Sequence, residues 1–393
     1  MKKLLTIAFL LITLMVTGCT PAIDNIIQPN PYNYGEETNI SNYCEESLDQ
    51  SLEQSYEDTT NIGFSVTTYR DFQVAPGNFG DLAVAFIEHM QDHLPFRLAF
   101  SDRELEASQW IASTLLEMGF EESQIEIQSF RIDTHTSSWW GGPSRMIEWY
   151  YESGYYDGLE LLEYSQNVIL TIPGRSDETI IIGAHYDGVG NPGISDNAAG
   201  VALLLESAYR MQSLDHYHTL QYIFYGAEEV GLIGAFYFAD SLSYEEIDNI
   251  VLVVNADVII EGPYFIYGVG YLEVLPEWPM DMLWGGDKPE ISQNQLTNSI
   301  SALANELANQ GIYLIAEPRS VIFPTDHLAF LGFGVPVLNF FGTYETIYPE
   351  LIYRNVLHTP DDCLDFFFEN FPGRIEDGLN TFGSFLELVI MSL

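Results

Sequence analysis

The chain has few basic side chains. Its 393 residues include 13 Lys and Arg against 57 Asp and Glu, which gives a formal net charge of -44 at pH 7. A negative field of this size repels phosphate backbones and anionic lipid surfaces. The composition therefore argues against nucleic acid as a partner. Two explanations of the acidity stay open: it keeps the protein soluble, or it favours substrates that carry a free ammonium group.

Cysteine is also scarce, with 3 residues in the chain. Apart from Cys19, the sequence contains Cys44 and Cys363, so a scaffold built on several disulfides is excluded. One bridge between those two residues is permitted in an oxidising compartment, and the sequence leaves it open. Neither cysteine belongs to a Cys-x-x-Cys pair, which argues against a zinc site built on thiolates.

The N-terminal apolar run is too short to span a membrane. Two lysines precede residues 4–17, and this stretch is shorter than the roughly 20 residues that a spanning helix needs. Residues 1–18 are therefore predicted to be a signal peptide. The letters Val-Thr-Gly-Cys, which end at Cys19, resemble the lipobox of bacterial lipoproteins, and an ordinary cleaved signal is the alternative. In both cases we expect an exported protein, anchored as a cell-surface or periplasmic lipoprotein if Cys19 is lipidated.

The remaining sequence divides into a tether and one domain. Residues 19–80 are rich in Asn, Ser, Glu and Tyr with little apolar periodicity, which predicts an acidic, flexible tether. Residues 81–393 are enough for one large core, because 47% of the whole chain is hydrophobic. We expect aromatic-rich insertions in this domain near residues 135–164 and 260–289.

Short apolar runs alternate with helical patterns through the predicted domain. Runs such as Ile180-Ile181-Ile182 are apolar on both faces, as strands covered by helices on both sides must be. This alternation predicts a single-domain α/β fold with a central, mostly parallel mixed sheet. The expected strands are 167–172, 179–183, 220–225, 250–254 and 335–340. The expected helices are a pair within 82–118, then 197–211, 229–239, 293–310 and 375–391.

Side chains that can bind metal follow several of these strands. Ligands gather beyond the carboxyl ends of the strands in such a sheet, so we expect these side chains at one rim. Imidazole nitrogen and carboxylate oxygen suit zinc, and two ions need a carboxylate that bridges them. Each acidic residue alone would more often be a helix cap or a surface charge, whereas the set together points to metal. The residues are His185, Asp187, Asp196, Glu228, Glu229 and Asp257.

Two features of this set suggest a division of tasks. Asp196 is followed by small residues that let the start of the helix pack closely, so Asp196 is the candidate for the bridging carboxylate. Glu228 and Glu229 are adjacent, and two such carboxylates after a buried strand repel each other unless a cation or a shared proton separates their tasks. One of them can bind metal while the other moves protons.

Four blocks of the sequence resemble the co-catalytic di-zinc exopeptidases, a family that includes the bacterial leucyl aminopeptidases and aminopeptidase Y. The resemblance extends from about Leu82 to the C-terminus and implies the zinc exopeptidase fold, which is similar to that of phosphorylases and hydrolases. The blocks are Gly183-Ala184-His185-Tyr186-Asp187, Ser195-Asp196-Asn197-Ala198-Ala199-Gly200, Gly226-Ala227-Glu228-Glu229-Val230-Gly231-Leu232-Ile233-Gly234 and Leu357-His358-Thr359-Pro360-Asp361-Asp362.

The resemblance implies two Zn²⁺ ions per chain. It assigns one ion to His185, Asp196 and Asp257, and the other to Asp196, Glu229 and His358. Asp196 is therefore shared between the ions. Asp257 is the loosest match, because it is recognised mainly by its place after a strand.

The resemblance also assigns the proton transfers. Glu228 matches the general base, which takes a proton from a metal-bridging water as it attacks the scissile carbonyl and then gives it to the leaving amine. Asp187 matches the acidic residue that orients the first ligand histidine. In some members a tyrosine before the last ligand histidine supports the oxyanion. Leu357 stands there in this chain, so the role is vacant or is filled by Tyr353 or a tyrosine of the insertions.

The other histidines are not expected to bind metal. The segment from Thr325 to Phe330 also resembles a family block, but His358 fits the ligand position better, so Asp326 and His327 are expected to line the pocket or support the ligands. The histidines expected to be surface or packing residues are His89, His93, His135, His216 and His218. Tryptophans that would suit an apolar wall for a peptide side chain are Trp139, Trp140, Trp149, Trp278 and Trp284.

The leading prediction is a secreted zinc-dependent aminopeptidase that acts on peptides with a free N-terminus, because the ligand set and the base are complete. One alternative is a glutaminyl cyclase-like acyltransferase of the same fold, which would bind one zinc. Another is a non-catalytic peptide-binding lipoprotein, which should lack a ligand or the base. The preferred side chain, the polarity of cleavage and the oligomeric state are left open by the sequence.

Overall fold

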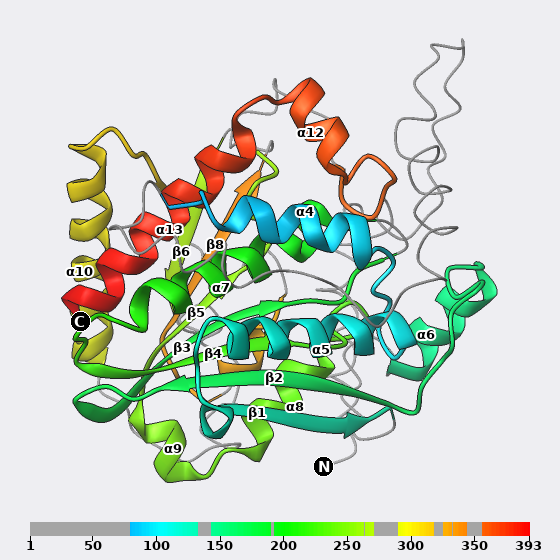
Figure 1. Ribbon diagram of the computed structural model, residues 1–393. Coiled ribbons are helices and arrows are strands. Elements are labelled where there is room, and N and C mark those ends of the chain that lie inside the picture. The colour runs from blue at the N-terminus through cyan, green and yellow to red at the C-terminus, as the bar shows by residue number, and fades with distance from the viewer. Residues whose placement is uncertain are drawn as a thin grey trace, which may run out of the picture. The chain divides into compact units, whose positions relative to one another are not determined.

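The computed structural model of the protein describes residues 79–132, 143–189, 192–262, 264–270, 290–317, 325–331, 333–343 and 356–393 (Figure 1). The predicted signal and nearly all of the predicted tether lie outside these residues. Among the helices that are described, none combines the length and the apolar character that a membrane crossing requires.

The described strands form one mixed sheet in the order β1-β2-β4-β3-β5-β8-β6-β7 (Figure 1). The central strands β4, β3, β5 and β8 are parallel to one another. Strand β2 is antiparallel to β1 and β4, while β6 is antiparallel to β8 and parallel to β7. The expected α/β fold with a parallel centre is therefore confirmed. The strands are β1 (Ile125–Arg131), β2 (Tyr164–Ile172), β3 (Ser176–His185), β4 (His218–Tyr225), β5 (Ile250–Ala256), β6 (Tyr264–Gly270), β7 (Ile315–Glu317) and β8 (Val337–Thr343).

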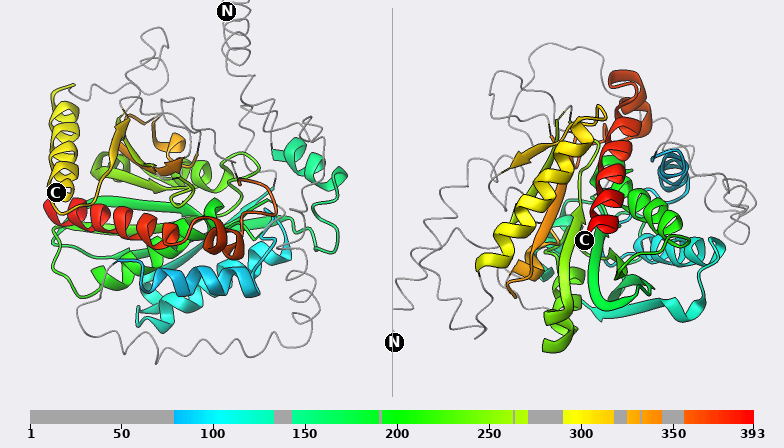
Figure 2. Two further views of the ribbon diagram at one scale, coloured as in Figure 1. Left: turned by 90° about the horizontal axis from the view of Figure 1, so that it is seen from above. Right: turned by 90° about the vertical axis from the view of Figure 1, so that its left-hand side faces the viewer.

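Helices cover both faces of the sheet (Figure 2). One core includes buried residues of α4, α5, α7, α10 and α13, and a second core includes buried residues of α8, α9 and α11. The helical elements are α4 (Ala83–His93), α5 (Asp102–Glu117), η1 (Glu122–Gln124), α6 (Pro143–Glu152), η2 (Ile194–Ala198), α7 (Ala199–Met211), α8 (Ile233–Ser241), α9 (Tyr244–Asn249), α10 (Glu290–Ala308), α11 (Leu328–Leu331), α12 (Leu364–Asn370) and α13 (Arg374–Ser392).

Strand β3 shows why the central runs are apolar on both faces. Ile180 and Ile182 belong to the core beneath α7, whereas Ile181 belongs to the core beneath α8. Successive side chains of a strand point to opposite faces, so a strand inside this fold must be apolar at every position. Burying each such side chain contributes about 1.5–3 kcal/mol, which makes β3 a firm support for the residues that follow it.

The helix expected from Glu229 begins later, at Ile233. Ala227 and Leu232 have positive φ values of 56° and 60°, which a continuous right-handed helix does not allow. The main-chain N–H of Glu229 donates to the Asp187 carboxylate, 3.1 Å away, which ties this segment to the residues that follow β3. Residues 229–232 therefore form a turn, and the carboxylate of Asp187 holds its first residue in place. The helix expected from residue 197 likewise starts at 199, after the irregular turn η2.

The two predicted insertions contain regular structure in their described parts. Strand β6 lies within residues 260–289 and pairs with β8 over its full length, so this part belongs to the sheet. Helix α6 lies within residues 135–164. Residues 135–142 and 271–289, with four of the five tryptophans proposed as a wall, lie outside the described residues.

Cys363 stands directly before α12 and is 2% exposed. It is disulfide-bonded, and its partner lies outside the described residues. Cys19 and Cys44 both lie outside the described residues, so the bridge between Cys44 and Cys363 that the sequence permitted stays a prediction.

Candidate metal centre

The candidate ligands come from five separate segments at the carboxyl ends of the parallel strands. His185 is the last residue of β3, and Asp196 lies in η2 before α7. Glu229 follows β4, Asp257 follows β5, and His358 lies in the segment before α12. All five are brought together, as the sequence analysis expected.

Asp196 lies between the two histidines. Its Oδ1 is 3.1 Å from the Nε2 of His185, and its Oδ2 is 3.1 Å from the Nε2 of His358. On the first side, Asp257 Oδ1 is 3.2 Å from His185 Nε2. On the second side, Glu229 Oε2 is 3.0 Å from His358 Nε2. Each oxygen of Asp196 therefore belongs to a different three-residue group.

These two groups have the chemistry of zinc sites. The ligand atoms of each group lie within 4.8 Å of one another, and both groups supply imidazole nitrogen and carboxylate oxygen. Glu229 Oε1 is buried and has no hydrogen-bond partner in the described part of the chain, as expected of an oxygen that binds a cation. The residues therefore fit a pair of zinc ions that share Asp196.

The site concentrates negative charge away from water. Burial raises the pKa of Glu229 to about 7, with a further rise from Asp196 and an opposing effect of His358. Burial likewise raises the pKa of Glu228 well above its usual range, although His185 opposes this. Burial disfavours ionisation of Asp196 too, yet the hydrogen bonds from His185 and His358 hold its pKa below the usual value. Divalent cations would relieve this repulsion.

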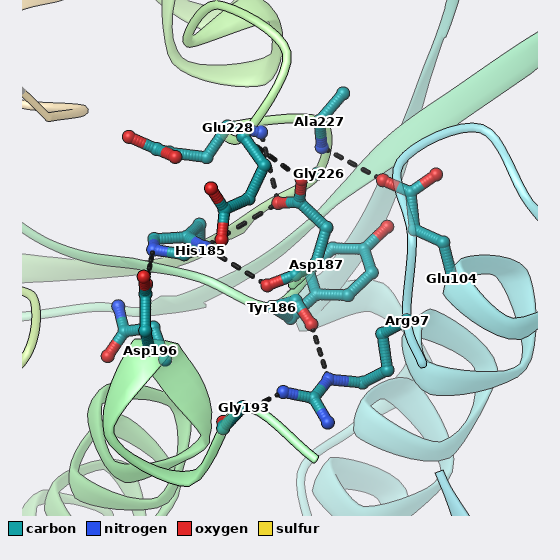
Figure 3. A network of polar contacts seen from close by, with 12 residues as sticks. Arg97, Glu104, His185, Tyr186, Asp187, Gly193, Asp196, Gly226, Ala227 and Glu228 are labelled. Atoms are coloured by element: carbon teal, nitrogen blue, oxygen red, sulfur yellow. Dashed lines mark hydrogen bonds and ion pairs between the residues drawn. The ribbon is translucent and has the colours of Figure 1, made fainter. Parts of the chain in front are cut away.

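Asp187 is fully buried and fastens the segment that carries both glutamates (Figure 3). Its Oδ1 accepts a hydrogen bond of 3.0 Å from the N–H of Glu228, and its Oδ2 accepts one of 3.1 Å from the N–H of Glu229. The Nδ1 of His185 lies 3.2 Å from the main-chain carbonyl oxygen of Asp187 and 3.6 Å from its Oδ1. A distance of 3.6 Å is too long for a hydrogen bond, so the carbonyl orients the imidazole and the carboxylate positions Glu228.

Three other buried carboxylates hold main-chain amides close to the candidate ligands. Asp362 Oδ1 accepts from the N–H of Ser195 at 2.6 Å, and its Oδ2 accepts from the N–H of Asp196 at 3.2 Å. Glu261 Oε1 accepts from the N–H of Val356, two residues before His358, at 2.9 Å.

Glu104 performs the same task on the other side of the site (Figure 3). Its Oε1 accepts from the N–H of Ala227 at 2.8 Å and from the hydroxyl of Ser165 at 2.8 Å. None of the sequence-based predictions concerned Glu104, Glu261 or Asp362. Asp362 stands in a matched block, and that was its one available signal.

The remaining predicted pocket residues are buried but lie outside the metal groups. Asp326 and His327 are 1% and 0% exposed, and their side-chain polar atoms have no hydrogen-bond partner in the described residues. Burial lowers the pKa of His327 to about 3, so its ring is neutral. The hydroxyl of Tyr150, on α6, lies 3.4 Å from the carbonyl oxygen of Glu229. Tyr353 lies outside the described residues.

The other histidines show no metal grouping in the described part of the chain. His89 stacks on Trp110 with ring centroids 4.9 Å apart, as expected of a packing residue. His216 and His218 are each 5% exposed, and the Nδ1 of His216 contacts the carbonyl oxygen of His218 at 2.7 Å.

Comparison with known proteins places this fold and site in a class. The sequence profile of peptidase family M28 matches residues 167–381, which is more than half of the 393 residues. The chain belongs to this family. The resemblance seen in the sequence is thereby confirmed, and the expected enzyme class, a peptidase, agrees with the family.

Curated relatives match over shorter stretches. The chain is 39% identical over 108 residues to the probable lipoprotein aminopeptidase LpqL of Mycobacterium tuberculosis, covering 26% of this chain and 22% of that protein. It is 28% identical over 193 residues to aminopeptidase YwaD of Bacillus subtilis, covering 49% of this chain and 37% of that protein. The matches therefore span well under half the length of either relative.

Solved structures show the same fold at low identity. The zinc aminopeptidase BSAP of Bacillus subtilis superimposes with a TM-score of 0.56 at 15% identity, over 79% of this chain and 95% of that one. A glutaminyl cyclase from an Acidobacteriales bacterium gives a TM-score of 0.55 at 18% identity, over 82% and 98%. Because both classes share the architecture, the fold does not separate hydrolysis from cyclisation.

Proposed function

We propose that the protein is a zinc-dependent aminopeptidase that hydrolyses the N-terminal peptide bond of peptides. His185, Asp196 and Asp257 would hold one ion, and Asp196, Glu229 and His358 the other. The observation that carries the proposal is the position of Asp196, whose two oxygens each lie 3.1 Å from the Nε2 of a different histidine. A shared carboxylate is what two neighbouring ions need.

Glu228 is the proposed general base. It lies beside Glu229, and its carboxyl can join a three-residue group with His185 and Glu229. When bound, zinc ions act as Lewis acids that polarise a carbonyl and lower the pKa of water. Glu228 takes the proton of the attacking water and delivers it to the leaving amine. Its raised pKa suits a group that must both accept and donate a proton.

Asp187 fixes Glu228 through the main chain rather than through the reacting atoms. Its bonds to the N–H groups of Glu228 and Glu229 leave both glutamate carboxyls free to act. The acidic surroundings also favour a substrate with a free ammonium group over one whose N-terminus is blocked. Peptides with a free N-terminus are therefore the proposed substrate class.

The test uses the full exported chain and a panel of aminoacyl anilides, with and without a chelator. Elemental analysis should find two zinc ions per chain, and the chelator should abolish turnover. Replacing Glu228 by glutamine should lower kcat by about 10²–10⁴-fold while zinc content stays the same. Glu126→Gln, on the exposed face of edge strand β1, is the matched control and should keep full activity. Chelator-insensitive turnover would sink the proposal.

The same preparation tests cyclisation as the second candidate, which the likeness to a glutaminyl cyclase motivates. A cyclase should contain one zinc and convert N-terminal glutamine into pyroglutamate with release of ammonia. An aminopeptidase should instead release free glutamine from the same peptide. A protein that binds peptides but yields neither product would support the non-catalytic alternative.

We further propose export and lipid anchoring through Cys19. The likeness to a protein named a probable lipoprotein aminopeptidase supports this assignment. Acylation uses the thiol of Cys19, which would leave Cys44 as the partner of the bonded Cys363. Labelled palmitate should enter the wild type and not Cys19→Ser. A non-reducing digest that joins residue 363 to residue 19 would contradict the assignment.

A further inference from the structure

Arg97 is a buried cation beneath the candidate metal centre (Figure 3). It lies in the segment between α4 and α5 and is 1% exposed. Among the described residues, the acceptors of its guanidinium are all main-chain carbonyl oxygens. Nε donates to Tyr186 at 2.7 Å, Nη1 to Leu94 at 3.0 Å and to Pro192 at 2.8 Å, and Nη2 to Gly193 at 3.1 Å.

Three of these carbonyls, those of Tyr186, Pro192 and Gly193, belong to the two segments that carry His185 and Asp196. Tyr186 directly follows His185, and Gly193 comes three residues before Asp196. The Arg97 main chain adds a contact, because its carbonyl accepts from the N–H of Gly188 at 2.9 Å. The planar fork therefore spans the end of β3 and the turn η2, and it fixes the distance between His185 and the bridging carboxylate.

The surroundings of Arg97 allow little freedom. A Cβ added at Gly188 would lie 3.3 Å from the Asp196 carbonyl oxygen and 3.7 Å from Arg97 Nη2, so the three groups are already in close contact. Burial lowers the pKa of Arg97 to about 10, while Asp362, Asp187, Asp196 and Glu229 favour its charge. Arg97 stays protonated at neutral pH and faces an acidic cluster.

Resting on the zinc centre proposed above, we infer that Arg97 is a positioning residue that sets zinc affinity by holding His185 and Asp196 at bridging distance. It touches no reacting atom. Arg97 acts through the four carbonyl oxygens to which it donates. These hydrogen bonds fix the plane of its guanidinium, and the nearby carboxylates stabilise its charge. In the described part of the chain Arg97 makes no hydrogen bond to a carboxylate, and no sequence motif assigns it a role.

The fork geometry makes a sharp distinction between arginine and lysine. Three nitrogens of Arg97 reach four carbonyls in three segments, which a single ammonium nitrogen cannot do. Arg97→Lys keeps the charge and loses the fork, while Arg97→Met loses both. If positioning dominates, most of the loss appears already in the lysine variant.

The experiment measures zinc binding to the metal-free full chain by competition with a chromophoric chelator, together with thermal stability. We expect Arg97→Met to bind zinc about 100-fold more weakly and Arg97→Lys about 30-fold more weakly, both within the range seen when groups supporting metal ligands are removed. The affinities for both zinc ions should fall together, because Asp196 belongs to both ligand groups. If Arg97→Met does not fold, Arg97→Lys alone decides the question.

Arg210 supplies the matched control. It is a largely buried arginine in the last turn of α7, paired with Glu206 at 2.6 Å, and it lies about 16 Å along the helix from Ala199. Arg210→Lys and Arg210→Met should lower thermal stability and leave zinc affinity unchanged.

Two results would overturn the inference while wild type still binds two zinc ions. One is an affinity within twofold of wild type in the folded Arg97 variants. The other is an equal loss of affinity in the Arg210 variants, which would reduce the effect to general stability. Wild type that binds no zinc would instead refute the proposed function, so the two failures are distinguishable.

Discussion

Replacing Glu261 by glutamine should change how the stability of the metal-free protein depends on pH. The side chain is 5% exposed, and its Oε1 accepts from the N–H of Val356 at 2.9 Å. Burial raises the pKa of Glu261 from 4.5 to about 8, against the effect of the Val356 hydrogen bond and with a further rise from Asp362. Glutamine keeps the acceptor oxygen and removes the charge.

The sign follows from proton binding in the two states. Between pH 4.5 and about 8, the folded protein holds a proton on Glu261 that the unfolded chain has released. The free energy of unfolding therefore falls as pH rises through this window. A pKa difference of 8 − 4.5, or about 3.5, corresponds to ~5 kcal/mol at 1.36 kcal/mol per pKa unit.

Urea unfolding of wild type and the variant between pH 4.5 and 9, with a chelator present, measures the effect. Glu261→Gln should gain stability relative to wild type as pH rises, by up to ~5 kcal/mol at pH 9. Glu261→Ala should show the same gain with pH but sit about 1–3 kcal/mol lower throughout, because the Val356 N–H loses its acceptor. Parallel curves for wild type and Glu261→Gln would refute the reasoning.

Three further predictions concern the same centre. Gly200→Ala should destabilise the fold by about 3 kcal/mol, seen as a lower urea midpoint, because the new Cβ would lie 2.6 Å from the Ala256 carbonyl oxygen; an unchanged midpoint would contradict this. Asp187→Asn should weaken zinc binding about 10–100-fold in chelator competition. The amide N–H₂ would face one of the two main-chain N–H groups that now donate to the carboxylate, so two donors would oppose each other. Zinc at about 100 times its Kd should add ~2.7 kcal/mol to the stability of wild type, and its thermal shift should be largely lost in Asp196→Asn; an equal shift in both would count against a shared ligand.

The central part of the fold could be predicted because its physics is local. Residues 180–182 of β3 and 250–254 of β5 are apolar at every position, and His185 and Asp257 each come three residues after such a run, which locates both the strands and these two side chains. The edge strands lack this signal. β1 alternates weakly between exposed and half-buried positions, and β6 lies in a Tyr-rich and Gly-rich stretch that predicts a loop as readily as a strand.

Sequence pattern failed where a tertiary contact replaced a local one. Helical spacing predicts a helix from Glu229, but the positive φ of Leu232 interrupts it, and Asp187, 42 positions before Glu229, holds the N–H of that residue. Glu261 and Val356 are 95 positions apart, and Asp362 reaches Ser195 across 167 positions. No spacing rule links such residues, so the acidic groups that fasten the loops appear only when the chain is folded.

The bridging carboxylate has a consequence for the time at which the centre can form. Asp196 is held at its N–H by Asp362 and faces His358, and both partners belong to the final tenth of the 393-residue chain. A nascent chain that ends before them contains four of the five candidate ligands and lacks both His358 and Asp362. Synthesis must therefore pass residue 362 before this centre can assemble, which would delay any hydrolytic capacity until both partners of Asp196 have been made.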